Sequence, residues 1–177
     1  MTVADQIAEW LHEKGITTIF GIVGAGNIAI FNAIARLKKT QIICQHHEQA
    51  CVLAAGSFFR VSGRISVALV TTGAGSTNAI TGVASCWMDS VPVIVISGNE
   101  AGKYMNAPTR VWGVQGYDSR GMAENMTKFP AHRVNAQAIF QKKQIQMLED
   151  CYKASLNPRM GPTWIDIPKD LQNAVVG

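Results

Sequence analysis

The residues best suited to chemistry stand in four short groups, each directly after an apolar run. The groups are Gly24-Ala25-Gly26-Asn27, His46-His47-Glu48, the stretch from Thr71 to Asn78, and Gly98-Asn99-Glu100. Glycines let a flat ligand approach the backbone, and free N–H groups at helix starts can bind its polar atoms. Glu48 is the most unusual member, because this carboxylate begins an alanine-rich, apolar segment.

The apolar runs before these groups are typical of buried strands. They are continuous rather than alternating, at residues 17–23, 40–45, 65–72 and 91–98, and a later one covers 161–168. Helical spacing predicts helices at 3–14, 27–37, 47–61, 76–88 and 136–156, with a loop at 99–118 and an extended piece at 126–134. This alternation predicts one doubly wound α/β domain, a mostly parallel sheet with helices on both faces. Ligands of such sheets bind outside the carboxyl ends of the strands, where all four groups lie.

Each group alone is a weak motif. Gly24-Ala25-Gly26 is not the GxGxxG pattern, and Gly73-Ala74-Gly75-Ser76 lacks the lysine of a phosphate-binding loop. Taken alone, each is better explained as a tight strand-to-helix turn. The adjacent His46 and His47 cannot face one metal ion across a helical turn, so we expect no metal site. Glu48, taken alone, is a helix-start carboxylate that interacts favourably with the helix dipole.

The composition excludes several classes of protein. Apolar residues make up 47% and charged residues 16%, which is typical of a globular domain. The net charge of +4 is scattered, so we expect no nucleic-acid partner. No apolar run approaches the roughly 20 residues that span a membrane, and the first segment is too acidic for a signal peptide. We therefore expect a cytoplasmic protein. Its four cysteines lack CxxC spacing and are expected to be reduced thiols: Cys44, Cys51, Cys86 and Cys151.

The order and spacing of the groups are far more specific than any one of them. The segment from His46 to Asn99 closely resembles the N-terminal, pyrimidine-binding domain of thiamine-diphosphate enzymes, and the acetolactate-synthase-like branch fits best. The resemblance extends over residues 15–27, 114–134 and 161–172, and so covers nearly the whole chain. The positions that carry the pattern are Glu48, Phe59-Arg60, Gly63, Gly73 to Asn78, Asp89 and Pro92.

This resemblance implies a cofactor and roles for particular residues. The glutamate matching Glu48 hydrogen-bonds N1′ of the aminopyrimidine ring of thiamine diphosphate, which favours the tautomer whose N4′ removes the proton from thiazolium C2. Gln115 is similar to a glutamine that reaches the reacting centre in acetolactate synthases. The resemblance implies that the cofactor-binding residues are Val23, Gly24, Ala25, Glu48, Thr72, Gly73 and Asn78.

The chain also departs from the family pattern. Ala74 replaces the proline of the family's Gly-Pro-Gly motif. Gly24-Ala25-Gly26 occupies the place where relatives often have Pro-Gly-Gly, and Gly116 replaces an acidic residue that is common at its position. The family holds the diphosphate and Mg²⁺ through a Gly-Asp-Gly motif, but this sequence contains no Asp-Gly pair. We therefore expect residues 1–177 to form a single pyrimidine-binding domain, with Mg²⁺ supplied by a partner domain.

The resulting expectation is one half of a composite enzyme, either a separate subunit or a piece of a longer chain. Its implied reaction is decarboxylation of small 2-oxo acids or acyloin- and acetolactate-type C–C bond formation. We expect the chain to be inert alone, and to form a homodimer or a complex with a diphosphate-binding subunit. The alternatives are a non-catalytic interaction module that keeps the fold and the dimer surface, and a flavodoxin-like nucleotide binder, which rests on fold class alone.

Overall fold

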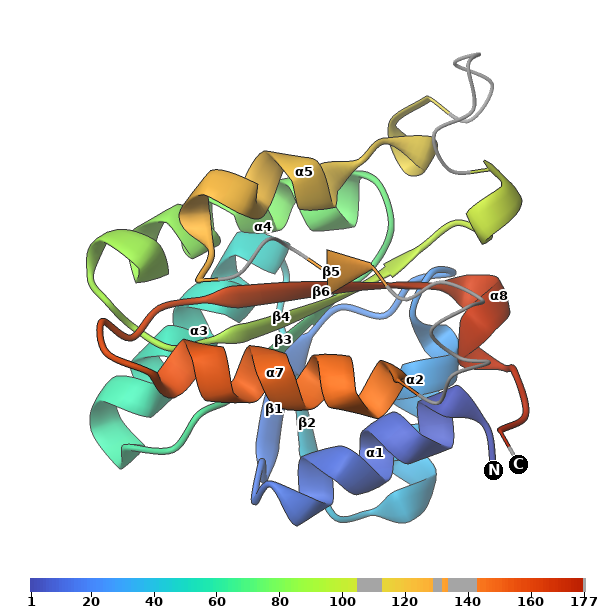
Figure 1. Ribbon diagram of the computed structural model, residues 1–177, viewed down its shortest axis with the longest axis horizontal. Helices are drawn as coiled ribbons and strands as arrows, with labels where there is room; N and C mark the ends of the chain where they lie inside the picture. The colour runs from blue at the N-terminus through green and yellow to red at the C-terminus, as the bar shows by residue number, and fades with distance from the viewer. Residues whose placement is uncertain (105–112, 129–131, 134–142, 177) are drawn as a thin grey trace.

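The centre of the molecule is a parallel sheet, seen in a computed structural model that describes residues 1–104, 113–128, 132–133 and 143–176 (Figure 1). Its six strands run in the order β2-β1-β3-β4-β6-β5, and every neighbouring pair is parallel. Every residue of β1, β3, β4 and β6 is buried, which explains the continuous apolar runs of the sequence. The strands are β1 (Thr18–Gly21), β2 (Gln41–Cys44), β3 (Val67–Val70), β4 (Ile94–Asn99), β5 (His132–Arg133) and β6 (Thr163–Pro168).

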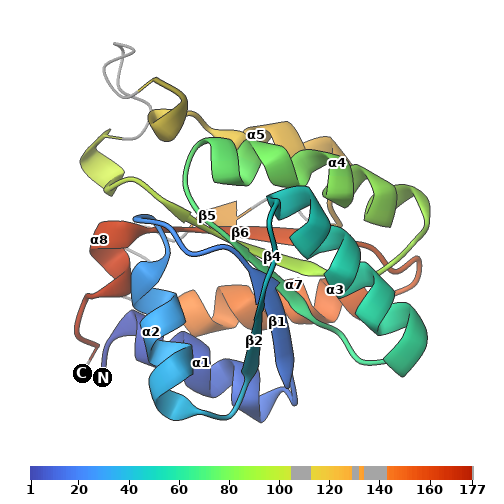
Figure 2. The ribbon, with the colours of Figure 1, turned by 180° about the vertical axis from the view of Figure 1, so that it is seen from behind.

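Helices cover both faces of the sheet (Figures 1 and 2). One face carries α1 (Val3–Glu13), α2 (Ile28–Leu37) and α7 (Gln144–Leu156). The other carries α3 (Glu48–Ser62), α4 (Ala74–Met88) and the short α5 (Ser119–Ala123). Helix α8 (Lys169–Gln172) follows β6, and the short 3-10 turns are η1 (Gly102–Tyr104), η2 (Gly113–Gly116) and η3 (Glu124–Met126). The doubly wound α/β fold predicted from the sequence is thus confirmed.

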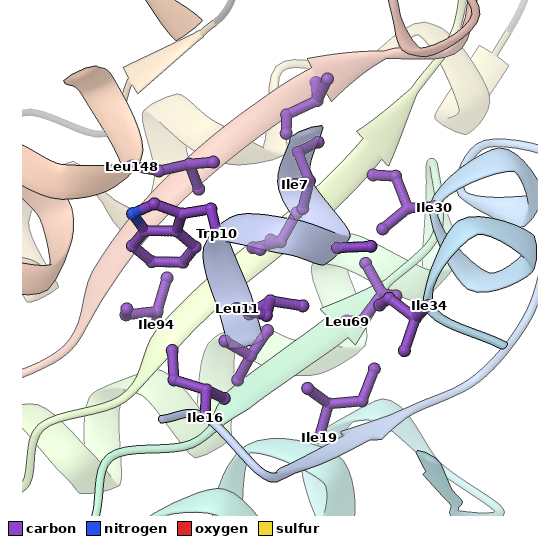
Figure 3. Close-up of a cluster of buried hydrophobic side chains, with 14 of the residues drawn as sticks. Ile7, Trp10, Leu11, Ile16, Ile19, Ile30, Ile34, Leu69, Ile94 and Leu148 are labelled. Atoms are coloured by element: carbon purple, nitrogen blue, oxygen red, sulfur yellow. The ribbon is translucent and has the colours of Figure 1, made fainter. Parts of the chain in front are cut away.

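The core has two layers because the sheet buries side chains on both faces. On the first face, Ile7, Leu11 and Ile34 pack with strand residues such as Ile19 and Leu69 (Figure 3). On the second face, the buried cluster includes Val52 of α3, Val83 of α4, and Val70, Val95 and Trp164 of the strands. The two apolar layers fix the sheet between the helices and so fix the ends of its strands.

Helices α3 and α4 approach each other closely through glycine. A Cβ added to Gly82 would lie 2.7 Å from Cβ of Val52, and one added to Gly56 would lie 3.0 Å from Sγ of Cys86. Arg60 and Asp89 form an ion pair at 2.5 Å between the far ends of the helices. The small residues of α3 therefore serve packing within the domain, and the N-termini of α3 and α4 lie side by side.

The two ends of the chain meet beside α1 (Figures 1 and 2). Thr2 and Val175 form an antiparallel bridge, and Val3 N donates to Ala174 O at 3.0 Å. Val176 N donates to Met1 O at 3.0 Å. The C-terminal residues thereby complete the packing of the first helix.

Some elements differ from the sequence predictions. The expected loop at 99–118 contains η1 and η2, and α5, η3 and α8 were not predicted. Of the helix expected at 136–156 the structure shows α7, and residues 136–142 lie outside the described part of the chain. Of the extended piece at 126–134 it shows β5, while 129–131 and 134 also lie outside. Among the described residues, no helix has both the length and the apolar character to span a membrane.

Candidate functional site

The site lies where the strand order reverses, between the carboxyl ends of β1 and β3. In open α/β sheets this is the crevice that receives ligands. Gly26 N donates to Thr71 Oγ1 at 3.1 Å, which joins the loop after β1 to the loop after β3. A Cβ added to Gly24 would lie 2.5 Å from Thr71 Oγ1, so this close approach requires glycine.

The loop after β1 is held in shape by a buried asparagine. Asn27 is fully buried; its Oδ1 accepts from Gly24 N at 2.8 Å and its Nδ2 donates to Ile22 O at 3.0 Å. Val23, with 53% of its surface exposed, and Ala25 project outward from the same loop. The loop therefore presents an apolar side chain and backbone groups on a rigid base.

Glu48 is the first residue of α3, and its carboxylate is buried. Only 8% of the residue is exposed, and Oε2 accepts a hydrogen bond from Nδ2 of Asn78 on α4 at 3.0 Å. The other oxygen, Oε1, faces Gly75, where an added Cβ would lie 3.2 Å away. No residue in the described part of the chain donates a hydrogen bond to Oε1. This oxygen is available to a ligand, and the missing side chain of Gly75 keeps the space beside it open.

The neighbours of Glu48 have structural roles. His47 caps α3, because its Nδ1 accepts from Gln49 N at 3.2 Å. Cys51 is fully buried, and burial, followed by the nearby charge of Glu48 and then Cys44, raises the pKa of its thiol to about 12. Cys51 is therefore a neutral thiol at physiological pH.

The loop after β3 meets the η2 turn. Gly73 has φ +63° and ψ −120°, a conformation that glycine adopts without strain. A Cβ added there would lie 2.8 Å from Oε1 of Gln115, so the Gln115 side chain packs directly on Gly73. Thr72 Oγ1 donates to the carbonyl oxygen of Gln115 at 2.8 Å. Two contacts thus hold Gln115 at the same loop.

The structure brings most of the predicted site residues together. Thr71 lies at the centre: its side chain adjoins Gly24 and Gly26, and a Cβ added to Gly75 would lie 2.6 Å from its Cγ2. Gly75 in turn adjoins Glu48. Asn78 is hydrogen-bonded to Glu48, and Gln115 contacts Thr72 and Gly73. The predicted residues connected by these contacts are Gly24, Glu48, Thr72, Gly73, Asn78 and Gln115. Val23 and Ala25 are exposed on the first loop, without a described contact to the other members.

Sequence reasoning missed three residues of this arrangement. Thr71 carried a signal, since it follows a strand directly, but it was not assigned a role. Asn27 carried a weaker one, as a polar residue at a strand-to-helix turn. Gln172 carried none: it belongs to a four-residue helix, and its Nε2 donates to Gly26 O, 146 positions away in sequence.

The donor set suits an organic ring better than a metal ion. Among the side chains that the structure describes, no group of three or more His, Cys, Asp or Glu could hold a metal ion. A buried carboxylate with one oxygen available can accept a hydrogen bond from a ring nitrogen that carries a proton. The glycines at 24, 73 and 75 leave the backbone accessible to a flat group. The arrangement thus offers an accessible carboxylate oxygen beside a surface of backbone groups that a flat ring could contact.

Known proteins are similar to this chain in sequence. The family described as "Thiamine pyrophosphate enzyme, N-terminal TPP binding domain" matches residues 1–128. Acetolactate synthase isozyme 1 large subunit of Escherichia coli (strain K12) is 30% identical over 177 residues, which are 98% of this chain and 29% of that protein. Acetolactate synthase large subunit of Corynebacterium glutamicum is 31% identical over 174 residues, 98% of this chain and 26% of that protein. The corresponding subunit of Buchnera aphidicola subsp. Schizaphis graminum is 34% identical over 170 residues, 95% of this chain and 28% of that protein.

These matches set the scope of the assignment. The chain spans less than a third of the length of these three relatives, so it corresponds to one part of them. The doubly wound α/β fold agrees with the matched family, whose match covers residues 1–128. The chain belongs to the thiamine pyrophosphate enzyme family, and it carries that family's N-terminal cofactor-binding domain.

Proposed function

We propose that this chain is the pyrimidine-binding half of a thiamine-diphosphate enzyme that acts on small 2-oxo acids. The reaction class is decarboxylation or acetolactate-type C–C bond formation. Support for the reaction class comes from relatives named acetolactate synthase large subunits. Support for the binding role comes from the geometry of Glu48.

The available oxygen of Glu48 is the single observation that carries the proposal. A carboxylate that served only the helix start would face solvent, where water competes for its hydrogen bonds. Glu48 is instead 92% buried, with Oε2 held by Asn78 and Oε1 beside Gly75. Oε1 is not among the fully buried polar atoms that lack a partner, so it is accessible, and the N–H group of a ligand can donate to it without displacing a hydrogen bond of the protein. We assign Oε1 to the protonated N1′ of the cofactor's aminopyrimidine ring.

Other residues of the chain orient the ring and limit access to it. Val23 contributes an exposed apolar side chain, while Gly24 and Gly73 let a flat group approach the backbone. Gln115, packed on Gly73, offers an amide at the rim of the site. When bound, thiamine diphosphate supplies the carbon nucleophile and electron sink of the reaction. The part of Glu48 is to hold a proton at N1′, in a place where little water competes.

The partner proposals rest on what the described residues offer. They include no metal cluster, so we assign the diphosphate and Mg²⁺ to a separate domain or subunit. We also expect a homodimer through the outer side of α3 and α4. There the exposed apolar residues Leu53, Val61 and Met88 have 38%, 90% and 73% of their surface accessible. Light scattering should give twice the chain mass, and Val61→Glu with Met88→Glu should give a monomer; a wild-type monomer at high concentration would contradict this surface.

A titration of the isotope-labelled chain with thiamine diphosphate and Mg²⁺ tests the binding role. We expect the amide resonances of Gly24, Gly73 and Asn78 to shift, because these residues border the proposed ring position. An analogue with carbon in place of N1′ is the matched ligand control and should bind at least about tenfold more weakly, since it leaves Oε1 without a partner. Equal affinity for both ligands would remove Glu48 from the role proposed here.

A further inference from the structure

Two side chains of the C-terminal segment reach the loops of the candidate site. Gln172 of α8 is 1% exposed and Asp166 of β6 is fully buried. Both lie beyond residues 1–128, the part of the chain that matches the family. The sequence patterns predicted no functional role for either residue.

Gln172 holds the loop after β1. Its Nε2 donates to Gly26 O at 2.6 Å and to Ile167 O at 2.8 Å. These two acceptors use both amide hydrogens and so fix the orientation of the side chain. On the other side of the loop, a Cβ added to Gly98 would overlap the carbonyl group of Gly26. The Gly26 peptide is therefore clamped between β4 and α8, and the first loop has one position.

Asp166 fixes the orientation of Asn99 at the end of β4. Asp166 Oδ2 accepts from Asn99 Nδ2 at 2.8 Å, and Asn99 Oδ1 accepts from Glu100 N at 2.8 Å. A flipped amide would place its oxygen against the carboxylate and its nitrogen against the N–H group, losing both bonds. Ser97 Oγ donates to Asp166 Oδ1 at 2.7 Å, which holds the carboxylate in place.

Asn99 in turn faces the loop after β3. Its Oδ1 lies 3.3 Å from Thr72 Oγ1, and the same hydroxyl lies 2.8 Å from the carbonyl oxygen of Gln115. Thr72 Oγ1 has one proton and two acceptors, so it donates mainly to the carbonyl oxygen of Gln115 at 2.8 Å and weakly to Asn99 Oδ1 at 3.3 Å, in a three-centre hydrogen bond. The contacts that begin at Asp166 therefore end at Gln115.

We infer that Gln172 and Asp166 are positioning residues of the cofactor site, one for the Gly24–Gly26 loop and one, through Asn99 and Thr72, for Gln115. The inference rests on the proposed function, since it makes these loops the ones that hold the cofactor ring. Neither residue is assigned a contact with the ring itself. Each instead fixes a loop that is proposed to contact the ring, and so acts on the chemistry only indirectly.

Hydrogen–deuterium exchange of the backbone amides of the full chain tests the role of Gln172 in holding the Gly24–Gly26 loop. Gln172→Leu keeps the size of the side chain and removes both bonds, so exchange at residues 24–27 should become about fivefold faster or more. The matched control is Gln144→Leu. Gln144 is a 2% exposed glutamine whose Nε2 donates to Gln6 Oε1 at 2.7 Å, on the face that carries α1 and α7. It loses a comparable bond, but exchange at 24–27 should not change.

The role of Asp166 is tested with variants of Asn99 and Thr72, the residues between Asp166 and Gln115, so that the buried Asp166 side chain stays in place. Asn99→Ala and Thr72→Val should each speed exchange at residues 113–116 by about fivefold, and Thr72→Ser should restore the wild-type rate. Ser66→Ala is the control: it removes a buried hydroxyl that donates to Thr18 O at 2.8 Å, near the opposite ends of β1 and β3. Unchanged rates in Gln172→Leu and Asn99→Ala, or equal increases in the two controls, would overturn the inference.

Thiamine diphosphate affinity separates this inference from the proposed function. Gln172→Leu should weaken binding several-fold, while Gln144→Leu, which removes a buried hydrogen bond on the face that carries α1 and α7, should bind as the wild type does. Equal weakening in both variants would show a general effect of stability and would count against positioning. A wild-type chain that does not bind the cofactor would contradict the proposed function, and the exchange rates at 24–27 and 113–116 would still decide the positioning.

Discussion

Replacing Glu48 by glutamine changes one atom of the proposed acid–base contact and little else. Glutamine has nearly the same size, so it should still fill the space between Asn78 and Gly75. Its carbonyl oxygen can still accept the hydrogen bond that Asn78 Nδ2 now donates at 3.0 Å. Its NH₂ group, however, cannot share a proton with a ring nitrogen as a carboxylate does.

The effect on stability should be small. Glu48 is the first residue of α3, where a negative charge gains about 0.5 kcal/mol from the helix dipole. Because the bond to Asn78 is retained, we expect the free energy of unfolding to fall by about 1 kcal/mol at most. Glu9→Gln on α1 is the matched control, since Glu9 is exposed and belongs to the opposite face of the sheet. It should change neither stability nor chemistry.

The effect on chemistry should be large. Losing one positioned acid–base contact typically slows a reaction by about 10²–10⁴-fold, which corresponds to roughly 3–5.5 kcal/mol of activation free energy. The assay is hydrogen–deuterium exchange at C2 of thiamine diphosphate, in the complete assembly that joins this chain to a diphosphate-binding domain. It measures the proton transfer that Glu48 is proposed to promote, and it is independent of the 2-oxo acid chosen.

The comparison of the two measurements decides the role of Glu48. If the Gln variant loses at most about 1 kcal/mol of stability but exchanges the C2 proton at least about a hundredfold more slowly, Glu48 acts on the cofactor. If it loses about 1 kcal/mol of stability and exchanges C2 as fast as the wild type, Glu48 is only a helix-start carboxylate. The second result would refute the reasoning that links its burial to catalysis.

Three further outcomes are expected. The purified chain alone, with thiamine diphosphate, Mg²⁺ and pyruvate, should release no CO₂ above the enzyme-free rate, because its sequence has no Asp-Gly pair and so lacks the Gly-Asp-Gly motif that holds the diphosphate and Mg²⁺; turnover would contradict this. Asp5 has its pKa lowered from 3.8 to about 2, first by the backbone and side chain of Thr2. The Asp5 carboxylate therefore stabilises the folded state by about 1 kcal/mol after solvent screening. This contribution is present above pH 4 and is lost as the pH falls towards 2. In urea unfolding, Asp5→Asn should be less stable than the wild type at pH 7, and the two stabilities should converge at pH 2. Gly98→Ala should cost about 3 kcal/mol, since the new methyl group would overlap Gly26. Gly102→Ala, whose Cβ would lie 3.9 Å from its nearest neighbour, should cost about 0.5 kcal/mol or less, and equal thermal midpoints would contradict the overlap.

Local patterns explain why the fold could be read from the sequence. The runs around Val67–Val70 and Ile94–Asn99 are buried on both faces, so continuous apolar character marked them as strands. Helix α3 ended as expected near Gly63, which adopts φ +69°. Glu48 was found because an acidic residue at an apolar helix start contradicts its surroundings, and such conflicts favour a functional site.

The rest depends on contacts between distant segments, which no local pattern contains. That Thr71 lies against Gly24 follows from the pairing of β1 with β3, and that Gln172 reaches Gly26 follows from the path of the chain after β6. Helix α8 has four residues, too few for a helical period to be recognised. The position of Gln115 depends on a hydroxyl of Thr72, 43 residues earlier.

The antiparallel bridge between Thr2 and Val175 holds the first and last described residues of the domain next to each other. A short linker from residue 176 to residue 1 would need to cross almost no space, since Val176 N already donates to Met1 O. New ends could open at Gly63, an exposed turn where nothing lies within 4 Å of an added Cβ. Such a circular permutant would begin with β3 and end with α3, yet would keep the spatial contacts of Glu48 with Asn78 and of Gln172 with Gly26. The order of the elements along the chain and the arrangement of the site are therefore separable, and a reporter fused at residue 1 or after residue 176 would leave the domain at nearly the same point of its surface.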